Sequence, residues 1–180
     1  QEKMRTRLNL EVSLAPEMVE LALSLKPESV CLVPENRKEV TTEGGLDILS
    51  HMERSQDAVK AFTDAGIPTS MFIDPDEKQL EASAEIGSPW VEMHTGSFAR
   101  AWYDQSKRAT ELETLRKGME FGISLGLRVN AGHGINYDNV EGAKQLEQVY
   151  EFNIGHSIIS RSITHGLVEA VQTMRSRLNE

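Results

Sequence analysis

Short apolar runs alternate with longer amphipathic stretches along the whole chain. Each run is three to five residues long and almost continuously apolar, which is typical of parallel strands buried on both faces. The pattern predicts strands over residues 8–12, 30–33, 69–73, 90–94, 128–131 and 152–154.

The stretches between these runs carry helix signals. Met18, Ala22 and Leu25 recur at helical spacing and mark one apolar face. Gly66 and Pro68 form a stop signal, because glycine caps a helix and proline prevents its continuation. These and similar signals predict helices over residues 16–25, 46–65, 76–86, 110–125, 139–149 and 166–178.

Six strands that are each followed by a helix predict a parallel sheet with right-handed crossovers. Such a sheet is either open and doubly wound or closed into a barrel. Polar residues follow four of the predicted strands, and in a barrel the carboxyl ends of all strands open on one mouth, where such residues can meet. We therefore expect an α/β protein of the (β/α)8 TIM-barrel type. No Pro/Ser-rich linker divides the chain, so residues 1–180 are expected to form a single domain.

A complete barrel needs eight units and at least about 200 residues, whereas this chain of 180 residues carries six predicted units. Residues 1–7 resemble the end of a helix that enters a strand. We therefore expect the domain to be incomplete at its amino end. Six strands without closure leave two edges with unpaired backbone groups, so the segment alone is expected to associate or aggregate and to be inactive.

The acidic composition of the chain disfavours nucleic acid and anionic membranes as partners. The formal net charge is -9 and the pI is about 5.1, so the surface as a whole repels nucleic acid and anionic membranes. No apolar run approaches the roughly 20 residues that span a bilayer, and residues 1–8 lack the apolar core of a signal peptide. We expect a cytoplasmic protein without a nucleic-acid or membrane partner, which must hold any anionic ligand through local contacts.

Six short motifs follow one another along the chain near the predicted strand ends. They are Leu8-Asn9-Leu10-Glu11, Cys31-Leu32-Val33-Pro34-Glu35, Val40-Thr41-Thr42-Glu43-Gly44-Gly45-Leu46-Asp47, His94-Thr95-Gly96, Asn130-Ala131-Gly132-His133-Gly134 and Asn153-Ile154-Gly155-His156. Together they resemble the motifs of pyridoxine 5'-phosphate synthase of the deoxyxylulose-dependent vitamin B6 pathway. The resemblance runs from about Arg7 to the end of the chain and looks like the third to eighth βα units of that family's (β/α)8 barrel.

This resemblance implies a reaction, an assembly and a missing part. Family members condense 3-amino-2-oxopropyl phosphate with 1-deoxy-D-xylulose 5-phosphate to give pyridoxine 5'-phosphate, phosphate and water. They use no metal or organic cofactor and assemble into homo-octamers. Their first two units, which carry one catalytic histidine and a phosphate-contacting arginine, have no counterpart in this chain. The implied partners are therefore small phosphorylated substrates, inorganic phosphate as a product, and other copies of the chain.

Three residues are candidates for acid/base chemistry. Glu11 ends an apolar strand, where partial burial would raise its pKa toward the range of a general base; the alternative is a salt bridge at the strand end. His133 lies between two glycines, which allow a ligand to approach closely; the alternative is a solvent-exposed turn. Glu92 and His94 share one side of a strand, and such pairs are as often structural as catalytic. The resemblance implies that Glu11 is the base, His133 the proton donor and Glu92 a transition-state stabiliser, with His94 in support.

Phosphate would be bound at two other strand ends. Gly155 and His156 precede a stretch that could form a short helix, and the amino end of such a helix attracts anions. An ordinary strand-to-helix turn is the alternative. The resemblance assigns Gly134, Gly155 and His156 to the phosphate of the aminoketone. It assigns Thr41 to the deoxyxylulose phosphate, although a threonine before glycines usually shapes a turn.

The sequence also leaves alternatives open. Another phosphate-handling barrel lyase would need a strand-end lysine if it used a Schiff base, and Lys3, Lys26, Lys38 and Lys60 lie outside the predicted strand ends. A non-catalytic barrel fragment that binds phosphate or only assembles is the other alternative. No metal-ligand spacing is evident, and Cys31 is interpreted as a small buried hydrophobe. His51 and His165 are expected on the surface. Trp102 and Tyr103 could pack at a subunit interface or over the barrel mouth.

Overall fold

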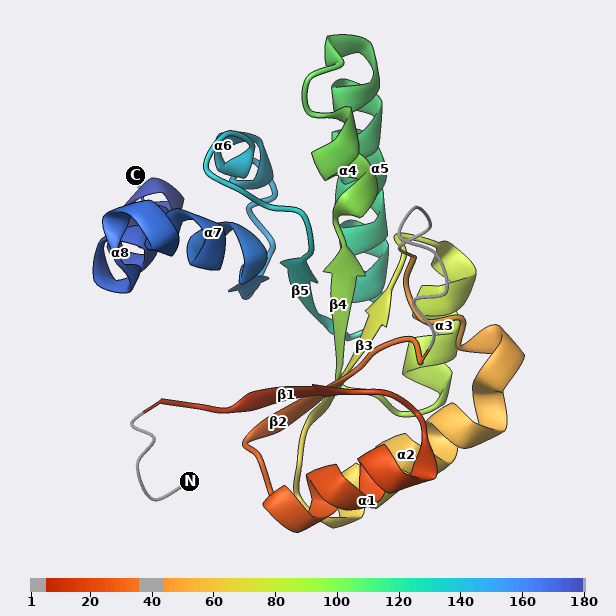
Figure 1. Ribbon diagram of the computed structural model, residues 1–180. Helices are drawn as coiled ribbons and strands as arrows, with labels where there is room; N and C mark the ends of the chain where they lie inside the picture. The colour runs from red at the N-terminus through yellow and green to blue at the C-terminus, as the bar shows by residue number, and fades with distance from the viewer. Residues whose placement is uncertain (1–5, 36–43, 180) are drawn as a thin grey trace.

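Strands and helices alternate in the computed structural model, which describes residues 6–35 and 44–179 (Figure 1). The six predicted strands are confirmed, each within one residue at either end. They are β1 (Asn9–Val12), β2 (Ser29–Leu32), β3 (Thr69–Ile73), β4 (Trp90–His94), β5 (Arg128–Gly132) and β6 (Phe152–Asn153).

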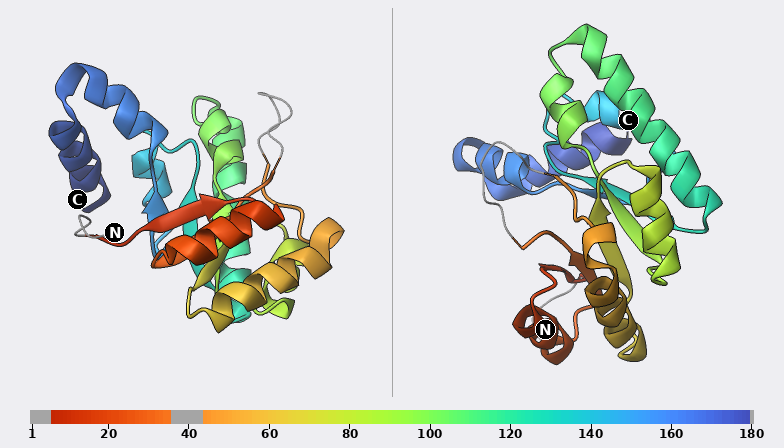
Figure 2. Two further views of the ribbon diagram at one scale, coloured as in Figure 1. Left: turned by 60° about the horizontal axis from the view of Figure 1, so that its bottom comes forward. Right: turned by 90° about the vertical axis from the view of Figure 1, so that its right-hand side faces the viewer.

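The strands form one parallel sheet whose spatial order is the order along the chain, β1 to β6. A doubly wound sheet would reverse its order at a switch point, so this topology supports the predicted barrel. The sheet curls into an incomplete barrel with helices on its outer side (Figures 1 and 2). An ion pair between Arg7, just before β1, and Glu151, just before β6, joins the two edges of the curled sheet.

The helices follow the sequence signals where those signals are local. α1 (Pro16–Leu25) matches its predicted range. Asp76 caps α3 (Glu77–Glu85) and Asp104 caps α5 (Gln105–Ser124) by accepting hydrogen bonds from backbone N–H groups. The remaining helices are η1 (Leu49–His51), α2 (Met52–Asp64), α4 (Gly96–Ala101), α6 (Val140–Ala143), α7 (His156–His165) and α8 (Leu167–Asn179). None of these helices, in the described part of the chain, has both the length and the apolar character needed to cross a membrane.

Two predicted helices begin at other residues than expected. The helix predicted over 110–125 begins five residues earlier, at Gln105, where Asp104 caps it, and the helix predicted over 46–65 begins at Leu49 as η1.

Three further differences concern whole elements. The predicted helix over 139–149 is wrong: only α6 forms, and the chain continues through turns that bury Leu146. α4 was not predicted, because it is too short to show a period and forms where Phe98 packs into the core and against Trp102. The short helix expected after His156 is a full helix of ten residues.

The two faces of the strands carry different kinds of side chain, whereas the apolar runs predicted strands that are apolar on both faces. Alternate positions such as Leu32, Met71, Val91 and Val129 belong to the hydrophobic core. The intervening positions carry polar or reactive side chains that lie toward the inside of the curl. These are Glu11 on β1, Cys31 on β2, Ser70 on β3, Glu92 and His94 on β4, Asn130 on β5 and Asn153 on β6.

Candidate functional site

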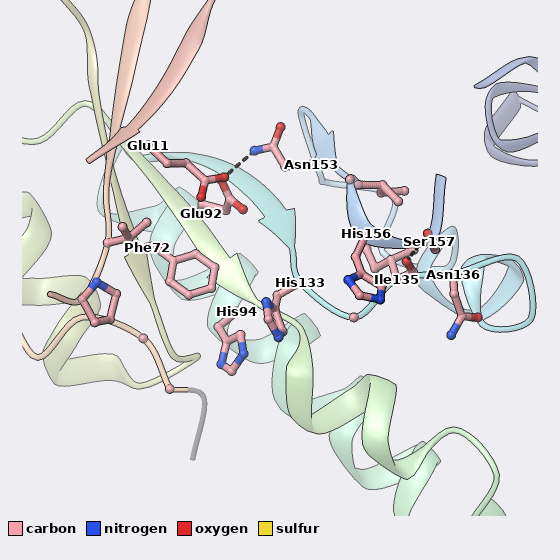
Figure 3. A pocket seen from close by; sticks show the side chains of 17 residues that line it. Glu11, Phe72, Glu92, His94, His133, Ile135, Asn136, Asn153, His156 and Ser157 are labelled. Carbon is pink, nitrogen blue, oxygen red and sulfur yellow. Dashed lines mark hydrogen bonds between the residues drawn. The ribbon is translucent and has the colours of Figure 1, made fainter. Parts of the chain in front are cut away.

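A pocket of about 690 Å³ opens at the carboxyl ends of the strands. This is the end of a barrel where catalytic residues gather. Figure 3 shows the carboxylates of Glu11 and Glu92 at one part of the pocket and His156 with Ser157 at another. Six of the seven sequence-predicted site residues line it, namely Glu11, Glu92, His133, Gly134, Gly155 and His156. The seventh, Thr41, lies outside the described residues.

Glu92 is held from two sides in the pocket. Its side chain is buried, with 3% of the residue exposed. The Asn153 amide donates a hydrogen bond to Oε2 at 2.6 Å, and the Cys31 thiol donates to the same oxygen at 3.6 Å. Burial raises the pKa of Glu92 to about 7, and the negative charge of Glu11 adds to the rise. Glu92 can therefore exist in either protonation state near neutral pH.

Cys31 fits its predicted role and adds a second one. It is fully buried, and burial raises the pKa of its thiol well above the usual value. The sulfur therefore stays protonated, packs as a small side chain and donates its proton to Glu92. The sequence alone did not suggest this contact, because the two residues are 61 positions apart.

Glu11 lies on β1 and lines the pocket, but the prediction that its side chain is partly buried is wrong. Its side chain is exposed, because β1 is an edge strand of the described sheet and only β2 pairs with it there. Glu11 influences the site electrostatically, because its negative charge raises the pKa of Glu92. A carboxylate in this position is accessible to a ligand in the pocket.

His133 follows β5 in a strained turn. Its φ is 80°, a left-handed conformation that is uncommon for residues other than glycine, and Gly134 continues the turn at φ 78°. The hydroxyl of Thr95 donates to the carbonyl oxygens of Gly132 at 2.7 Å and His133 at 2.6 Å. Strained backbone of this kind persists where neighbouring contacts hold it, and it is concentrated at functional sites.

His94 and Asp74 form a pair that the sequence reading did not identify as such. The Nδ1 atom of His94 lies 2.8 Å from Oδ1 of Asp74, and the imidazole is buried while the carboxylate is half exposed. The hydrogen bond from His94 lowers the pKa of Asp74. Asp74 directly follows β3, so its place at a strand end was a signal that could have found it.

The remaining part of the pocket is formed at the start of α7. Gly155 precedes the helix, and His156 and Ser157 are its first residues. The Ser157 hydroxyl donates to the carbonyl of Ile135 at 2.9 Å, which ties α7 to the segment after β5. Free N–H groups and the helix dipole at this end suit a phosphate group.

Other side chains considered in the sequence are placed away from the pocket. Trp102 packs against Phe98, and the exposed Tyr103 donates to Asp138 at 2.8 Å. His51 and His165 are exposed, as predicted. Lys26 ends α1 and Lys60 pairs with Asp64 on α2, while Lys3 and Lys38 lie outside the described residues. Within residues 6–35 and 44–179, no group of three or more His, Cys, Asp and Glu side chains is placed to hold a metal ion.

Asn153 and Glu151 should change the titration of Glu92 in opposite directions. Asn153→Ala removes the 2.6 Å donor that stabilises the ionised carboxylate, so the pKa of Glu92 should rise further above its usual value. Glu151→Gln removes a negative charge that raises this pKa, so the pKa should fall. A ¹³C NMR titration of the Glu92 carboxyl carbon measures both. Shifts of the same sign in both variants would contradict this description of the site.

The chain matches a family described as pyridoxal phosphate biosynthesis protein PdxJ over residues 1–180. It is 51% identical over 178 residues to a pyridoxine 5'-phosphate synthase of Opitutus terrae, covering 99% of this chain and 72% of that protein. It is 48% identical to the protein of the same name from Pseudoalteromonas translucida, covering 98% of this chain and 72% of that one.

Two solved structures with low sequence identity resemble this chain in fold alone. The tryptophan synthase A-subunit of Pyrococcus furiosus superposes with a TM-score of 0.62 at 12% identity, covering 99% of this chain and 67% of that one. The citrate synthase SbnG superposes with a TM-score of 0.55 at 14% identity, covering 97% of this chain and 74% of that one. The family model matches the whole chain, and the parallel strand order fits the barrel that the resemblance implies. The chain therefore belongs to the PdxJ family of biosynthetic enzymes.

Proposed function

We propose that this chain forms the site at which 3-amino-2-oxopropyl phosphate and 1-deoxy-D-xylulose 5-phosphate are condensed to pyridoxine 5'-phosphate, with release of phosphate and water. The observation that carries the proposal is the convergence of Glu11, Glu92 and His133 on one pocket from three different strands. Ring closure requires imine formation, proton removal next to a carbonyl, eliminations and an aldol-type step, so several acid/base groups must surround one intermediate.

The three groups suit different roles. Glu11 is accessible on β1 and acts as the general base that removes a proton from the bound substrate. His133 is held at the end of β5 and acts as the proton donor. Glu92 is buried between them and, with a pKa of about 7, stabilises charge that develops in the transition state.

Phosphate is bound at the other part of the pocket. The backbone at Gly134 and Gly155 and the side chain of His156 line it where α7 begins. A Cβ at Gly155 would meet nothing within 4 Å, which leaves room for a ligand against the backbone. Attraction built from backbone donors over short distances lets a chain of net charge -9 hold an anion. Thr41, outside the described residues, is proposed to contact the second substrate.

Assembly into a homo-oligomer is part of the proposal. α7 and α8 carry exposed apolar side chains, among them Ile163 with 83% and Val168 with 70% of the residue exposed. Apolar patches of this kind on a protein surface are often covered by another chain. The family resemblance implies an octamer, which sedimentation of the purified protein measures.

Phosphate release tests the function. The purified protein, with its mass verified, is supplied with both substrates and with each alone, and product formation is followed by the absorbance of pyridoxine 5'-phosphate. Release that requires both substrates supports the proposal. The Opitutus terrae relative, assayed in parallel, is the positive control. No release is expected from the 20.1 kDa chain alone, because it has no counterpart of the first two βα units. If the relative is active and a longer form of this protein that includes those units releases no phosphate, this chain does not form the proposed site.

A further inference from the structure

We propose that Asp74 and His94 form a positioning pair that holds the imidazole of His133 in the orientation it needs as a proton donor. This inference rests on the proposed function, because it assigns Asp74 and His94 a role that acts through His133. It adds two residues from β3 and β4 to a site whose acid/base groups come from β1, β4 and β5.

The first step is that Asp74 fixes the tautomer of His94. The hydrogen bond from His94 lowers the pKa of Asp74, so the carboxylate is ionised and can only accept hydrogen bonds. Nδ1 of His94, 2.8 Å away, must therefore carry a proton. The backbone N–H of Gly45 donates to the other oxygen of Asp74 at 3.1 Å, which limits rotation of the carboxylate.

The second step is that His94 restrains His133 by ring packing. The two imidazole centroids lie 5.0 Å apart with the planes inclined at 60°. Phe72 packs against both rings, with centroid distances of 5.2 Å to His94 and 6.4 Å to His133. Figure 3 shows the three rings grouped at the edge of the pocket. Asp74 thus fixes the orientation of the His94 ring, and this ring in turn restricts the orientation of the His133 ring by packing against it.

The surrounding backbone is fitted to this arrangement. A Cβ at Gly96 would lie 2.4 Å from Nε2 of His94, so only glycine leaves the imidazole its place. Thr95, the residue after His94, donates to the carbonyl oxygen of His133 at 2.6 Å. The same segment of chain therefore holds the backbone of His133 through Thr95 and its ring through His94.

Packing alone does not explain a histidine at this position. Nε2 of His94 is buried and has no hydrogen-bond partner within the described residues, and an unpaired buried polar atom reduces stability. An apolar ring would fill the same volume without this cost. The imidazole uses Nδ1 for its hydrogen bond to Asp74. Asp74 also accepts from the backbone N–H of Gly45, a residue that lines the pocket.

The tautomer and the ring contact can be observed without activity. In ¹⁵N-histidine-labelled protein, a long-range ¹H–¹⁵N spectrum distinguishes a protonated Nδ1 from a protonated Nε2. We expect Nδ1 of His94 to be protonated in the wild type. Asp74→Asn should shift the population of tautomers and move the ring resonances of His133. Glu77→Gln, which removes an exposed carboxylate on α3, should leave both unchanged.

Kinetics give the second readout. Misplacing a catalytic group by about 1 Å costs roughly 100-fold in rate, so Asp74→Asn should lower kcat about 10- to 100-fold with KM within about threefold. His94→Phe keeps a ring against His133 but loses the bond to Asp74, and it should lower kcat to a similar extent. Thermal unfolding, measured for each variant, checks that the protein is folded.

The outcomes separate this inference from the proposed function. If the wild type is active but Asp74→Asn leaves kcat and the His133 resonances unchanged, the positioning pair is wrong and the function stands. If the wild type is inactive, the spectra decide alone: an Nδ1-protonated His94 and displaced His133 resonances in Asp74→Asn support the pair, and their absence overturns it.

Discussion

Replacing Glu92 with glutamine should remove most of the activity and at the same time stabilise the folded protein above neutral pH. Glutamine keeps the shape of the side chain and an oxygen that can accept from Asn153, but it cannot ionise or transfer a proton. The loss of a group that stabilises charge in the transition state typically costs about 10² to 10³ in kcat. We expect a fall in kcat of that order in the phosphate-release assay.

The stability effect has a definite sign. The pKa of Glu92 rises on folding from 4.5 to about 7, so the folded state binds a proton more tightly than the unfolded state. Stability from this group is complete below pH 4.5 and is lost as the pH rises through 7. Glutamine stays neutral, so Glu92→Gln should exceed the wild type by about 3 kcal/mol at pH 8.5 and show little difference at pH 4.5.

Urea unfolding of both proteins from pH 4.5 to 8.5 measures this difference. Glu81→Gln is the matched control, because it removes an exposed carboxylate on α3 and its difference from the wild type should stay nearly constant with pH. Curves for Glu92→Gln and the wild type that run parallel across the range would show that Glu92 titrates normally, and the proposed electrostatics of the site would be wrong.

Gly132→Ala should disable the site through steric displacement of Glu92. A Cβ at this position would lie 2.2 Å from Oε1 of Glu92 and 3.0 Å from the carbonyl oxygen of Asn153. The backbone of Gly132 is held in β5, and its carbonyl accepts from the backbone N–H of Thr95 at 2.8 Å, so the carboxylate must move. We expect a fall in kcat of about 100-fold or more and a loss of roughly 1–3 kcal/mol in unfolding free energy.

A double variant tests whether the steric conflict is the cause. Glu92→Asp shortens the side chain by one methylene and makes room for the new methyl group. Combined with Gly132→Ala, it should recover stability relative to the sum of the single effects by about 0.5–3 kcal/mol, while activity stays low because the carboxylate is displaced. Additive effects in urea unfolding would place the damage somewhere other than at Glu92.

The sequence predicted the elements best where their causes are local. The apolar runs located all six strands to within a residue, and a proline start with apolar spacing located α1 over its whole range. Such signals act within one or two turns of chain. The helix predicted over 139–149 stops at Ala143, because the chain continues in turns in which the N–H of Leu146 donates to the carbonyl of Ala143 and the side chain of Leu146 is buried.

The strand-end motifs also located the candidate site. Reactive residues directly after several parallel strands indicated a common mouth, and six of seven named residues line one pocket. The described part of the chain forms six strands, fewer than the eight of a complete barrel. In agreement with this, the chain spans 72% of the length of each of two relatives. These conclusions need only the order of the elements and the residues at their ends.

Sequence by itself therefore determined the fold class, the family and six of the residues that line the pocket. Only the tertiary structure decided how these residues interact: that Cys31 and Asn153, each 61 positions from Glu92, meet on one of its oxygens, that Glu11 is exposed, and that Asp74 holds His94. The physical reason is that such contacts depend on the register of neighbouring strands and the curl of the sheet, which no local stretch of sequence encodes.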